Sequence, residues 1–348
     1  MTLQRSIPAG TIIRAKAPLR ISFVGGGTDL PVYFERYGGA VLSSTINRYA
    51  YVTLYPRTDR DVRIRSLDLS YLTTYALDSG PKYDGVLDLA KAAVHRIGVG
   101  CGIDMDIRSD APAGSGLGGS SALTAAVLGA AAALTGTVLS SYELAELNYT
   151  IEREDLKIAG GKQDQYATTF GGFNLIEFRT GRVIVTPLRI ERDILNDLEA
   201  HFLLCYTGRV RPDLGLVDKL VHSYQEERPD TLAAMREQHA LVYDMKEALL
   251  TGHIEHFGLM FHEAYGQKKR ALPEVTEGTP ADRLYDTARQ HGAIGGKLLG
   301  AGGGGYLLLY CETSRQQEVR RELERLGGQF TDFAFDTWGL QVWRSSAR

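Results

Sequence analysis

The sequence has few cysteines and no long hydrophobic run. Its 348 residues include three cysteines, Cys101, Cys205 and Cys311, with no CxxC pair, so a disulfide framework is not expected. The longest apolar run, around Ala125 to Leu134, is too short to cross a bilayer. The first residues also lack the apolar core of a signal peptide. We therefore expect free thiols, a cytoplasmic location and no membrane partner.

The sequence also lacks an excess of charge of either sign. It has 39 lysines and arginines against 42 aspartates and glutamates, so no strong field would attract nucleic acid or an anionic membrane. A small polar ligand fits this balance better than a nucleic acid. The length and the ordinary apolar content predict a globular protein of about two domains.

Strand and helix signals alternate along the chain, without internal repeats. Apolar and polar residues alternate with the period of a half-buried strand in three stretches, residues 51–56, 61–66 and 103–110. Helical spacing or capping residues predict helices over 86–98, 120–136, from Asp230, over 279–292 and over 314–328. Residues 330–343 have a strand-like composition. This mixture predicts an α+β protein, with a domain boundary near residues 190–200.

The stretch PAGSGLGGSSALTAA (112–126) places four glycines between a strand end and an alanine-rich helix. The first-turn amides of a helix are unpaired and its dipole is positive at that end. Glycines let the backbone approach an anion closely. The stretch therefore predicts a phosphate-binding loop.

Other glycine loops match parts of this stretch. A P-loop requires a lysine after the glycines, and none follows here. Gly114, Gly116 and Gly119 satisfy the GxGxxG pattern of dinucleotide-binding proteins, but the second strand with an acidic end about 20 residues later is missing. A GxSxG hydrolase frame is absent too. A glycine turn that only packs tightly is a further alternative, although two more glycine turns beside strands argue against it.

These three glycine-rich segments together resemble the motifs of one enzyme family. APLRISFVGGGTD (17–29), PAGSGLGGSSA (112–122) and KLLGAGGGGYLLL (297–309) are similar, in this order and spacing, to the motifs of the GHMP kinase superfamily of galactokinase, homoserine kinase, mevalonate kinase and phosphomevalonate kinase. The resemblance covers about residues 11–345. It implies an α+β fold with an N-terminal glycine-loop domain that binds ATP (11–195) and a ferredoxin-like C-terminal domain (196–348).

The resemblance also implies catalytic and nucleotide-binding residues. Asp164, in GGKQDQYATTFGGFN (160–174), matches the catalytic aspartate, and Arg20 would stabilise the hydroxylate and keep Asp164 ionised. Ser121 and Glu152 match the Mg²⁺-binding pair, and hydroxyl and carboxylate oxygens suit this ion. The ATP loop would comprise Pro112, Gly114, Gly116, Leu117, Gly118, Gly119, Ser120 and Ser121. Phosphoryl transfer needs this alignment and charge neutralisation.

The first motif argues against simple galactose recognition. Galactokinases carry a Glu-His pair where this chain has Gly26 and Gly27. The first motif and its continuation to Val52, the catalytic segment and LCYTG (204–208) are most similar to the D-glycero-D-manno-heptose 7-phosphate kinase group, and more distantly to L-fucokinase domains. This resemblance implies phosphorylation of the anomeric hydroxyl to give the 1,7-bisphosphate, a step toward nucleotide-activated heptose.

The expected substrate contacts follow from the same resemblance. They are Gly27, Thr28, Asp29, Lys162, Gln163, Arg209, Arg211, Gly302 and Gly303, of which Lys162, Arg209 and Arg211 are candidates for the cationic pocket of the 7-phosphate. The segment QKKRAL (267–272) is expected to be a solvated helix face instead.

Two alternative functions stay open: another sugar 1-kinase, such as an L-fucokinase, or a ligand-sensing protein that keeps the fold without turnover. The expected ligands are ATP and a sugar phosphate, and a homodimer is compatible with the sequence.

Overall fold

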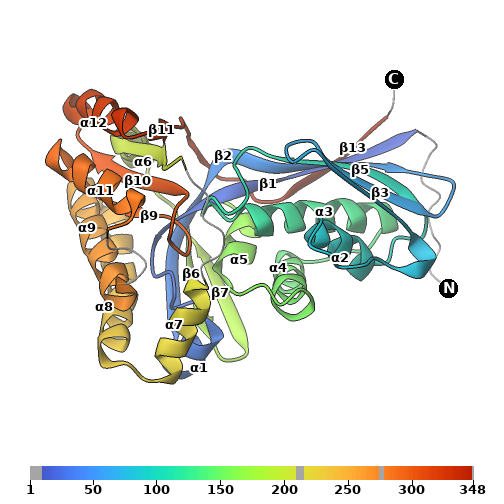
Figure 1. Cartoon of the computed structure of the whole chain (residues 1–348), viewed down its shortest axis with the longest axis horizontal. Coiled ribbons are helices and arrows are strands. Elements are labelled where there is room, and N and C mark those ends of the chain that lie inside the picture. The colour runs from blue at the N-terminus through green and yellow to red at the C-terminus, as the bar shows by residue number, and fades with distance from the viewer. Residues whose placement is uncertain (1–9, 209–214, 274–277, 347–348) are drawn as a thin grey trace.

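Two sheets, each with its own set of helices, form the two halves of an elongated molecule (Figure 1). The structure is a computed structural model, and it describes residues 10–208, 215–273 and 278–346. Most of the larger sheet and of its helices lies in the right half of Figure 1, and the smaller sheet with the long helices lies in the left half.

The larger sheet has nine strands. Its main path is β13-β1-β2-β5-β3-β4, and β12, β6 and β7 join beside β2. β3 and β5 run parallel, whereas β1, β2 and β5 are antiparallel neighbours. The strands are β1 (Thr11–Val24), β2 (Gly39–Pro56), β3 (Asp61–Ser66), β4 (Tyr71–Ala76), β5 (Ile103–Ser109), β6 (Asn174–Arg179), β7 (Arg182–Pro187), β12 (Phe335–Asp336) and β13 (Gln341–Ser346). Because β13 pairs with β1, the end of the chain returns to the first sheet.

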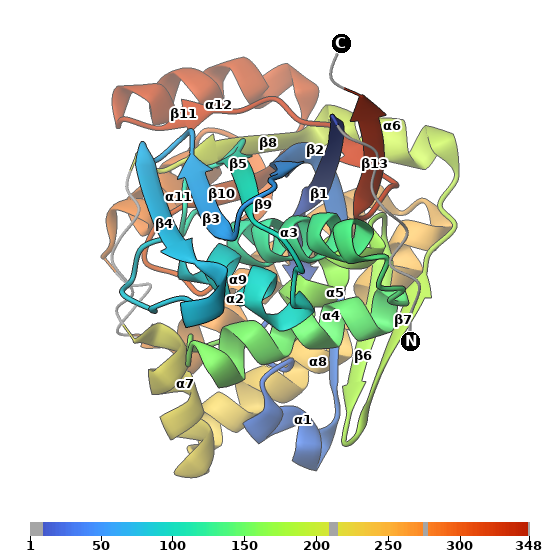
Figure 2. The same cartoon turned by 90° about the vertical axis from the view of Figure 1, so that its right-hand side faces the viewer.

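Helices α2, α3 and α4 cover the lower face of this sheet (Figures 1 and 2). The helices of this half are α1 (Pro31–Tyr37), α2 (Asp88–Ile97), α3 (Gly119–Thr135), α4 (Ser141–Thr150) and α5 (Gln163–Phe170). α3 is apolar on all sides and almost wholly buried, as expected for a central helix. Its alanines allow close packing against β1 and β2, and this packing fixes the position of its N-terminus.

The smaller sheet has the antiparallel order β11-β8-β10-β9. Its strands are β8 (Phe202–Tyr206), β9 (Ala293–Leu298), β10 (Tyr306–Cys311) and β11 (Gln329–Phe330). The helices around it are α6 (Arg192–His201), α7 (Leu216–Gln225), α8 (Pro229–Thr251), α9 (Ile254–Ala271), α11 (Pro280–Gln290) and α12 (Thr313–Arg325). β10 is buried on both faces, so this sheet lies between two helical layers.

An aromatic cluster joins the two halves. Phe23, near the end of β1, lies 5.6 to 6.2 Å, between ring centroids, from Phe202, Phe257 and Phe261 of the second half. These side chains belong to the core cluster that also contains the inner residues of β1, β2 and α3. Apolar burial of this kind favours one fixed arrangement of the halves. The division at residues 195/196 stays a prediction.

Most of the expected elements are present. The strands over 51–56, 61–66 and 103–110 and the helix over 86–98 agree with β2, β3, β5 and α2 to within about two residues, apart from the earlier start of β2. The expectation for residues 330–343 was wrong in detail, because this segment contains only the last residue of β11, the two-residue strand β12 and the start of β13. Cys205 and Cys311 are buried and Cys101 is half-buried, all three as free thiols.

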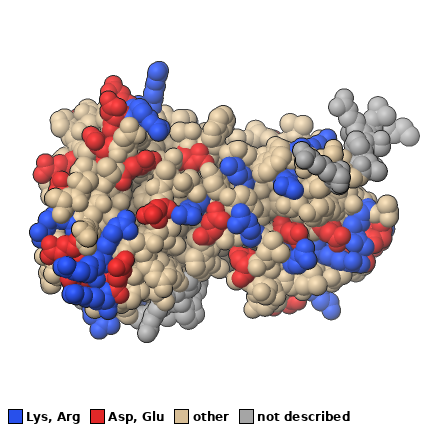
Figure 3. All heavy atoms as spheres, turned by 90° about the horizontal axis from the view of Figure 1, so that it is seen from above, with Lys and Arg blue, Asp and Glu red and all other residues tan. Residues whose placement is uncertain are grey.

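No helix among the described residues has both the length and the apolar composition that crossing a bilayer requires. Figure 3 shows basic and acidic side chains interspersed on the face seen from above, consistent with the balanced composition.

Candidate active site

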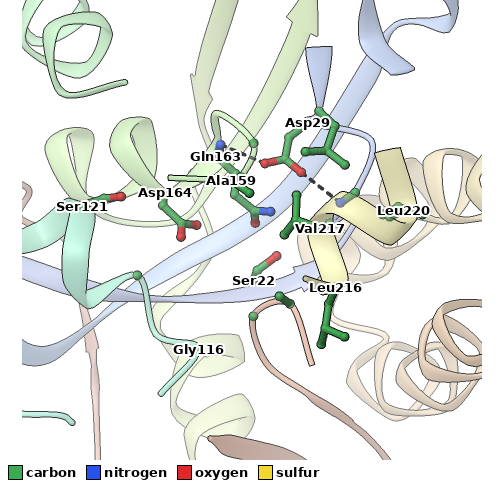
Figure 4. A pocket seen from close by; sticks show the side chains of 18 of the residues that line it. Ser22, Asp29, Gly116, Ser121, Ala159, Gln163, Asp164, Leu216, Val217 and Leu220 are labelled. Atoms are coloured by element: carbon green, nitrogen blue, oxygen red, sulfur yellow. Dashed lines mark hydrogen bonds between the residues drawn. The ribbon is translucent and has the colours of Figure 1, made fainter. Parts of the chain in front are cut away.

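A cavity of about 310 Å³ lies where the three glycine-rich turns meet (Figure 4). Gly26 and Gly27 of the first turn, Gly116 of the second, and Gly300 and Ala301 of the third all line it. Residues of α5 and of the helices α7, α8 and α9 complete the wall. Both halves of the molecule therefore contribute to one site.

Asp164 and Arg20 form an ion pair at this cavity. Asp164 lies in the first turn of α5 and its carboxylate points into the cavity (Figure 4). The Nε and Nη2 atoms of the buried Arg20 donate to Oδ1 at 2.8 and 2.7 Å. Both bonds end on the same oxygen, so Oδ2 can still accept a hydrogen bond from a ligand hydroxyl. Arg20 Nη1 donates to the carbonyl of Gly116, which ties this pair to the glycine loop.

Ser121 and Glu152 form a second buried polar pair. Ser121, in the first turn of α3, donates from Oγ to Glu152 Oε1 at 2.6 Å. Glu152 lies in a π-helical turn (η2, Ile151–Asp155) that continues α4, and such turns are frequent at functional sites. Burial raises the pKa of Glu152, while the neighbouring Arg153 lowers it.

The oxygen atoms of this pair fit a hard cation. Hydroxyl and carboxylate oxygens are the donors that Mg²⁺ prefers, together with phosphate oxygens and water. The described residues contain no group of three or more histidine, cysteine or acidic side chains able to hold a metal ion. A bound Mg²⁺ would therefore take most of its ligands from a nucleotide and from water.

Asp29 connects the first glycine turn to the start of α5. Its carboxylate accepts hydrogen bonds from the backbone amides of Gly27, at 2.9 Å, and Gln163, at 3.1 Å (Figure 4). Burial raises the pKa of Asp29. A Cβ atom on Gly161 would lie 2.0 Å from Asp29 Oδ2, so only glycine fits there. This contact positions the catalytic segment beside the first motif.

The second and third glycine turns pack directly on each other. Gly116 has φ +86°, and an added Cβ would lie 2.5 Å from the carbonyl oxygen of Leu299. An added Cβ on Gly300 would lie 2.6 Å from the Cα of Gly116. Ser115 O also accepts a hydrogen bond of 3.0 Å from the amide of Tyr306. The third turn therefore supports the shape of the second.

The expected nucleotide residues are divided between the cavity and the core. Gly114, Gly116, Gly118, Gly119, Ser120 and Ser121 line the cavity. Leu117 is buried and its carbonyl accepts the amide of Arg20 at 2.9 Å, and Pro112 is not among the lining residues. Nucleotide contact by all eight residues stays a prediction.

The expected substrate residues are divided in the same way. Gly27, Asp29 and Gln163 line the cavity. Thr28 is buried, with its hydroxyl donating to the carbonyls of Gly25 and Ala40. Lys162 pairs with Glu146 at 2.6 Å and lies over the ring of Tyr149, outside the lining. In the third turn, Gly300 and Ala301 reach the cavity rather than Gly302 and Gly303. Arg209 and Arg211 lie outside the described residues.

Six polar residues of the cavity wall were not predicted from the sequence: Ser22, Ser115, Arg153, Gln238, Lys268 and Lys297. The hydroxyl of Ser22 is buried and has no hydrogen-bond partner in the described part of the chain. The solvated helix face expected for 267–272 was wrong for Lys268, because its Nζ donates to backbone carbonyls at the cavity. Its spacing of four residues from the buried Ala264 is a signal that could have placed it on the inner face of α9.

Comparisons with known proteins agree with this geometry. The model of the GHMP kinases N terminal domain matches residues 85–172, and that of the GHMP kinases C terminal domain matches residues 245–329. The first match contains the second glycine turn and Asp164, and the second contains the third turn.

The similar full-length proteins include sugar kinases. A D-glycero-alpha-D-manno-heptose 7-phosphate kinase of Campylobacter jejuni is 37% identical, over 95% of this chain and 99% of that protein. An L-fucokinase/L-fucose-1-P guanylyltransferase of Bacteroides fragilis is 28% identical, over 96% of this chain and 39% of that protein. The crystal structure of a D-glycero-D-manno-heptose 1-phosphate kinase from Bacteroides thetaiotaomicron superimposes with a TM-score of 0.81 at 33% identity, covering 96% of this chain and all of that one. The chain therefore belongs to the GHMP kinase family, whose members take ATP as the phosphate donor.

Proposed function

We propose that this protein transfers the γ-phosphoryl group of ATP to the anomeric hydroxyl of D-glycero-D-manno-heptose 7-phosphate. The products are the heptose 1,7-bisphosphate and ADP. The observation that carries this proposal is the Asp164–Arg20 pair in a cavity built from all three glycine turns. The full-length similarity to the Campylobacter jejuni enzyme supports the choice of sugar. We place the reaction in the cytoplasm, where ATP is available.

The chemistry follows from the position of Asp164. Its Oδ2 accepts the proton of the anomeric hydroxyl while the hydroxyl oxygen attacks the γ-phosphorus, and the bond from that phosphorus to the β-phosphate oxygen breaks. Arg20 holds the carboxylate through Oδ1 and contributes positive charge near the developing hydroxylate. The cavity-lining backbone of the second glycine turn would contact the phosphates.

Ser121 and Glu152 would hold Mg²⁺, which neutralises charge on the phosphate oxygens when it is bound. The buried hydroxyl and carboxylate already lie 2.6 Å apart. A cation there would also compensate the buried charge of Glu152, whose pKa burial raises. Both residues come from helices that are packed into the core, so the pair is held in place.

We expect Glu152→Gln to raise the Mg²⁺ concentration for half-maximal rate by about tenfold or more, since an amide oxygen binds Mg²⁺ more weakly than a carboxylate. The measurement is a Mg²⁺ titration of the initial rate at saturating ATP. Glu154→Gln is the matched control, because Glu154 lies in the same π-helical turn but is exposed. Equal Mg²⁺ dependence in both variants would remove Glu152 from the metal site.

The proposed function is tested by ADP release from Mg-ATP with a panel of sugars. The panel contains D-glycero-D-manno-heptose 7-phosphate, the unphosphorylated heptose, L-fucose, galactose and mannose. Turnover with the 7-phosphate alone supports the proposal. Turnover with L-fucose or another free sugar would change the proposed substrate but leave the protein assigned as a sugar kinase. No turnover with any of them, while ATP still binds, would favour a ligand-sensing role.

A further inference from the structure

Two lysines of the second half lie on the cavity wall without an ion-pair partner among the described residues. Lys297, in β9, is buried and its Nζ donates to the carbonyl of Phe23 at 3.2 Å. Lys268, in α9, donates to the carbonyls of Leu298 at 3.1 Å and Gly300 at 2.7 Å. An ammonium group has three donors, so two N–H groups of Lys297 and one of Lys268 are unused by the described residues.

Within the described chain the charges of these lysines are compensated only in part, by Asp29, whose negative charge favours the charged form of Lys297. Neither forms an ion pair with a described carboxylate, whereas the other strongly buried cation of the wall, Arg20, is paired with Asp164. Burial and the neighbouring Arg20 lower the pKa of both lysines. Unpaired buried charge is costly. Two such lysines at a cavity wall are suited to bind an anion, because its negative charge would compensate theirs.

We infer that Lys268 and Lys297 together bind a phosphate dianion in the cavity, beside the third glycine turn. This inference rests on the proposed function for its ligands, which offer two sources of the dianion: the γ-phosphate of ATP and the phosphate on carbon 7 of the sugar. Lys162, expected from the sequence to bind the sugar phosphate, pairs with Glu146 instead. The two lysines provide a cationic pocket inside the described residues.

The backbone partners of the lysines place them between the two substrates. Gly300, bonded to Lys268, packs on Gly116 of the proposed ATP loop. Phe23, bonded to Lys297, directly precedes the turn that leads to Asp29 on the proposed sugar side. The pair therefore spans the region in which a sugar and the terminal phosphate of a nucleotide would meet.

This site predicts a loss of affinity at alkaline pH. The pKa of Lys268 is lowered to about 8, so the side chain is cationic below that pH and loses its charge as the pH rises through it. Arg20 is the charged group that disfavours the protonated form of Lys268, and Lys268 in turn disfavours that of Lys297, whose charged form Asp29 favours. We expect kcat/KM to fall above pH 8. In Lys268→Arg this alkaline limb of the pH profile should move to higher pH, because arginine stays charged. A limb that does not move would exclude Lys268 as its origin.

The direct test replaces each lysine by methionine, which keeps length and removes charge. We expect Lys297→Met and Lys268→Met each to raise one KM by at least tenfold, and arginine at the same positions to restore part of the affinity. A rise only for the 7-phosphate sugar identifies the sugar phosphate as the ligand. A rise in the KM for ATP, seen with both the phosphorylated and the free heptose, identifies the γ-phosphate as the ligand. Lys269→Met is the matched control, because Lys269 follows on the same helix but pairs with Asp282.

A second measurement does not depend on the sugar. Inorganic phosphate should raise the thermal midpoint of the unmodified protein and have a much smaller effect on Lys297→Met, even if the true substrate is a different sugar. Unchanged KM values in both methionine variants, together with equal stabilisation by phosphate, would overturn the inference and leave the lysines with a structural role. Failure of the heptose panel with phosphate stabilisation intact would overturn only the proposed substrate.

Discussion

We expect Asp164→Asn to lower kcat by about 100-fold to 10,000-fold, the range expected when a positioned proton acceptor is lost. Asparagine has the size of aspartate, and its amide oxygen can still accept the two hydrogen bonds that Arg20 gives to Oδ1. The amide nitrogen would replace Oδ2, so it donates where a proton acceptor is needed. The variant therefore loses proton transfer while it keeps the geometry of the site.

Two quantities are measured for this variant. They are the single-turnover rate and the affinity for ADP or a non-hydrolysable ATP analogue. We expect nucleotide affinity to stay within about threefold, since Asp164 contacts Arg20 rather than the backbone of the glycine loop. Thr168→Val is a useful control on the same helix, because its hydroxyl only donates to the carbonyl of Asp164 at 2.9 Å. Full turnover in Asp164→Asn would remove this residue from the mechanism.

Gly116→Ala should reduce nucleotide affinity by at least tenfold and also destabilise the fold. The residue has φ +86°, which costs a side chain about 1 to 2 kcal/mol. In addition, the new Cβ would lie 2.5 Å from the carbonyl oxygen of Leu299. The second and third glycine turns must therefore separate, and the carbonyl of Gly116 that Arg20 contacts moves with them.

Gly136→Ala is the control for Gly116→Ala, because it introduces backbone strain without a steric clash. Gly136 ends α3 with φ +76°, and an added Cβ would meet nothing within 4 Å. This control variant should lose about 1 kcal/mol of unfolding free energy and keep its nucleotide affinity. Thermal unfolding and ADP titration of both variants test the contrast. Equal nucleotide affinity in the two variants would show that the contact between the turns does not shape the nucleotide site.

Local sequence patterns predicted individual elements of the fold, whereas the central pair of the site came from the family resemblance. Strand alternation in 61–66 and helical spacing in 86–98 give β3 and α2, since each pattern matches one period. The composition of the glycine loop before α3 predicts that the loop binds phosphate. Asp164 and Arg20, 144 positions apart, came from the family resemblance, and their contact at 2.7 Å is a tertiary fact.

The other features of the site depend on tertiary packing, which local sequence patterns do not predict. Lys268 and its neighbours in 267–272 have the composition of a solvated surface, yet α9 packs against β9 and places this one lysine at the cavity. The third glycine turn packs on the second, since a Cβ added to Gly300 or Gly305 would meet Gly116 or Ser115, and contact of Gly302 and Gly303 with substrate stays a prediction. The π-helical turn that places Glu152 changes the helical phase within α4 and η2, and residue spacing alone gives no signal for it.

The central claim is the transfer of phosphate to the anomeric oxygen of a heptose 7-phosphate. The most direct measurement is ³¹P NMR of the reaction of the purified protein with Mg-ATP and D-glycero-D-manno-heptose 7-phosphate. The account predicts a second sugar phosphate resonance, coupled to the anomeric proton, that grows in proportion to ADP while the 7-phosphate resonance persists. Inorganic phosphate with ADP, or a new phosphate on any other carbon, would contradict it.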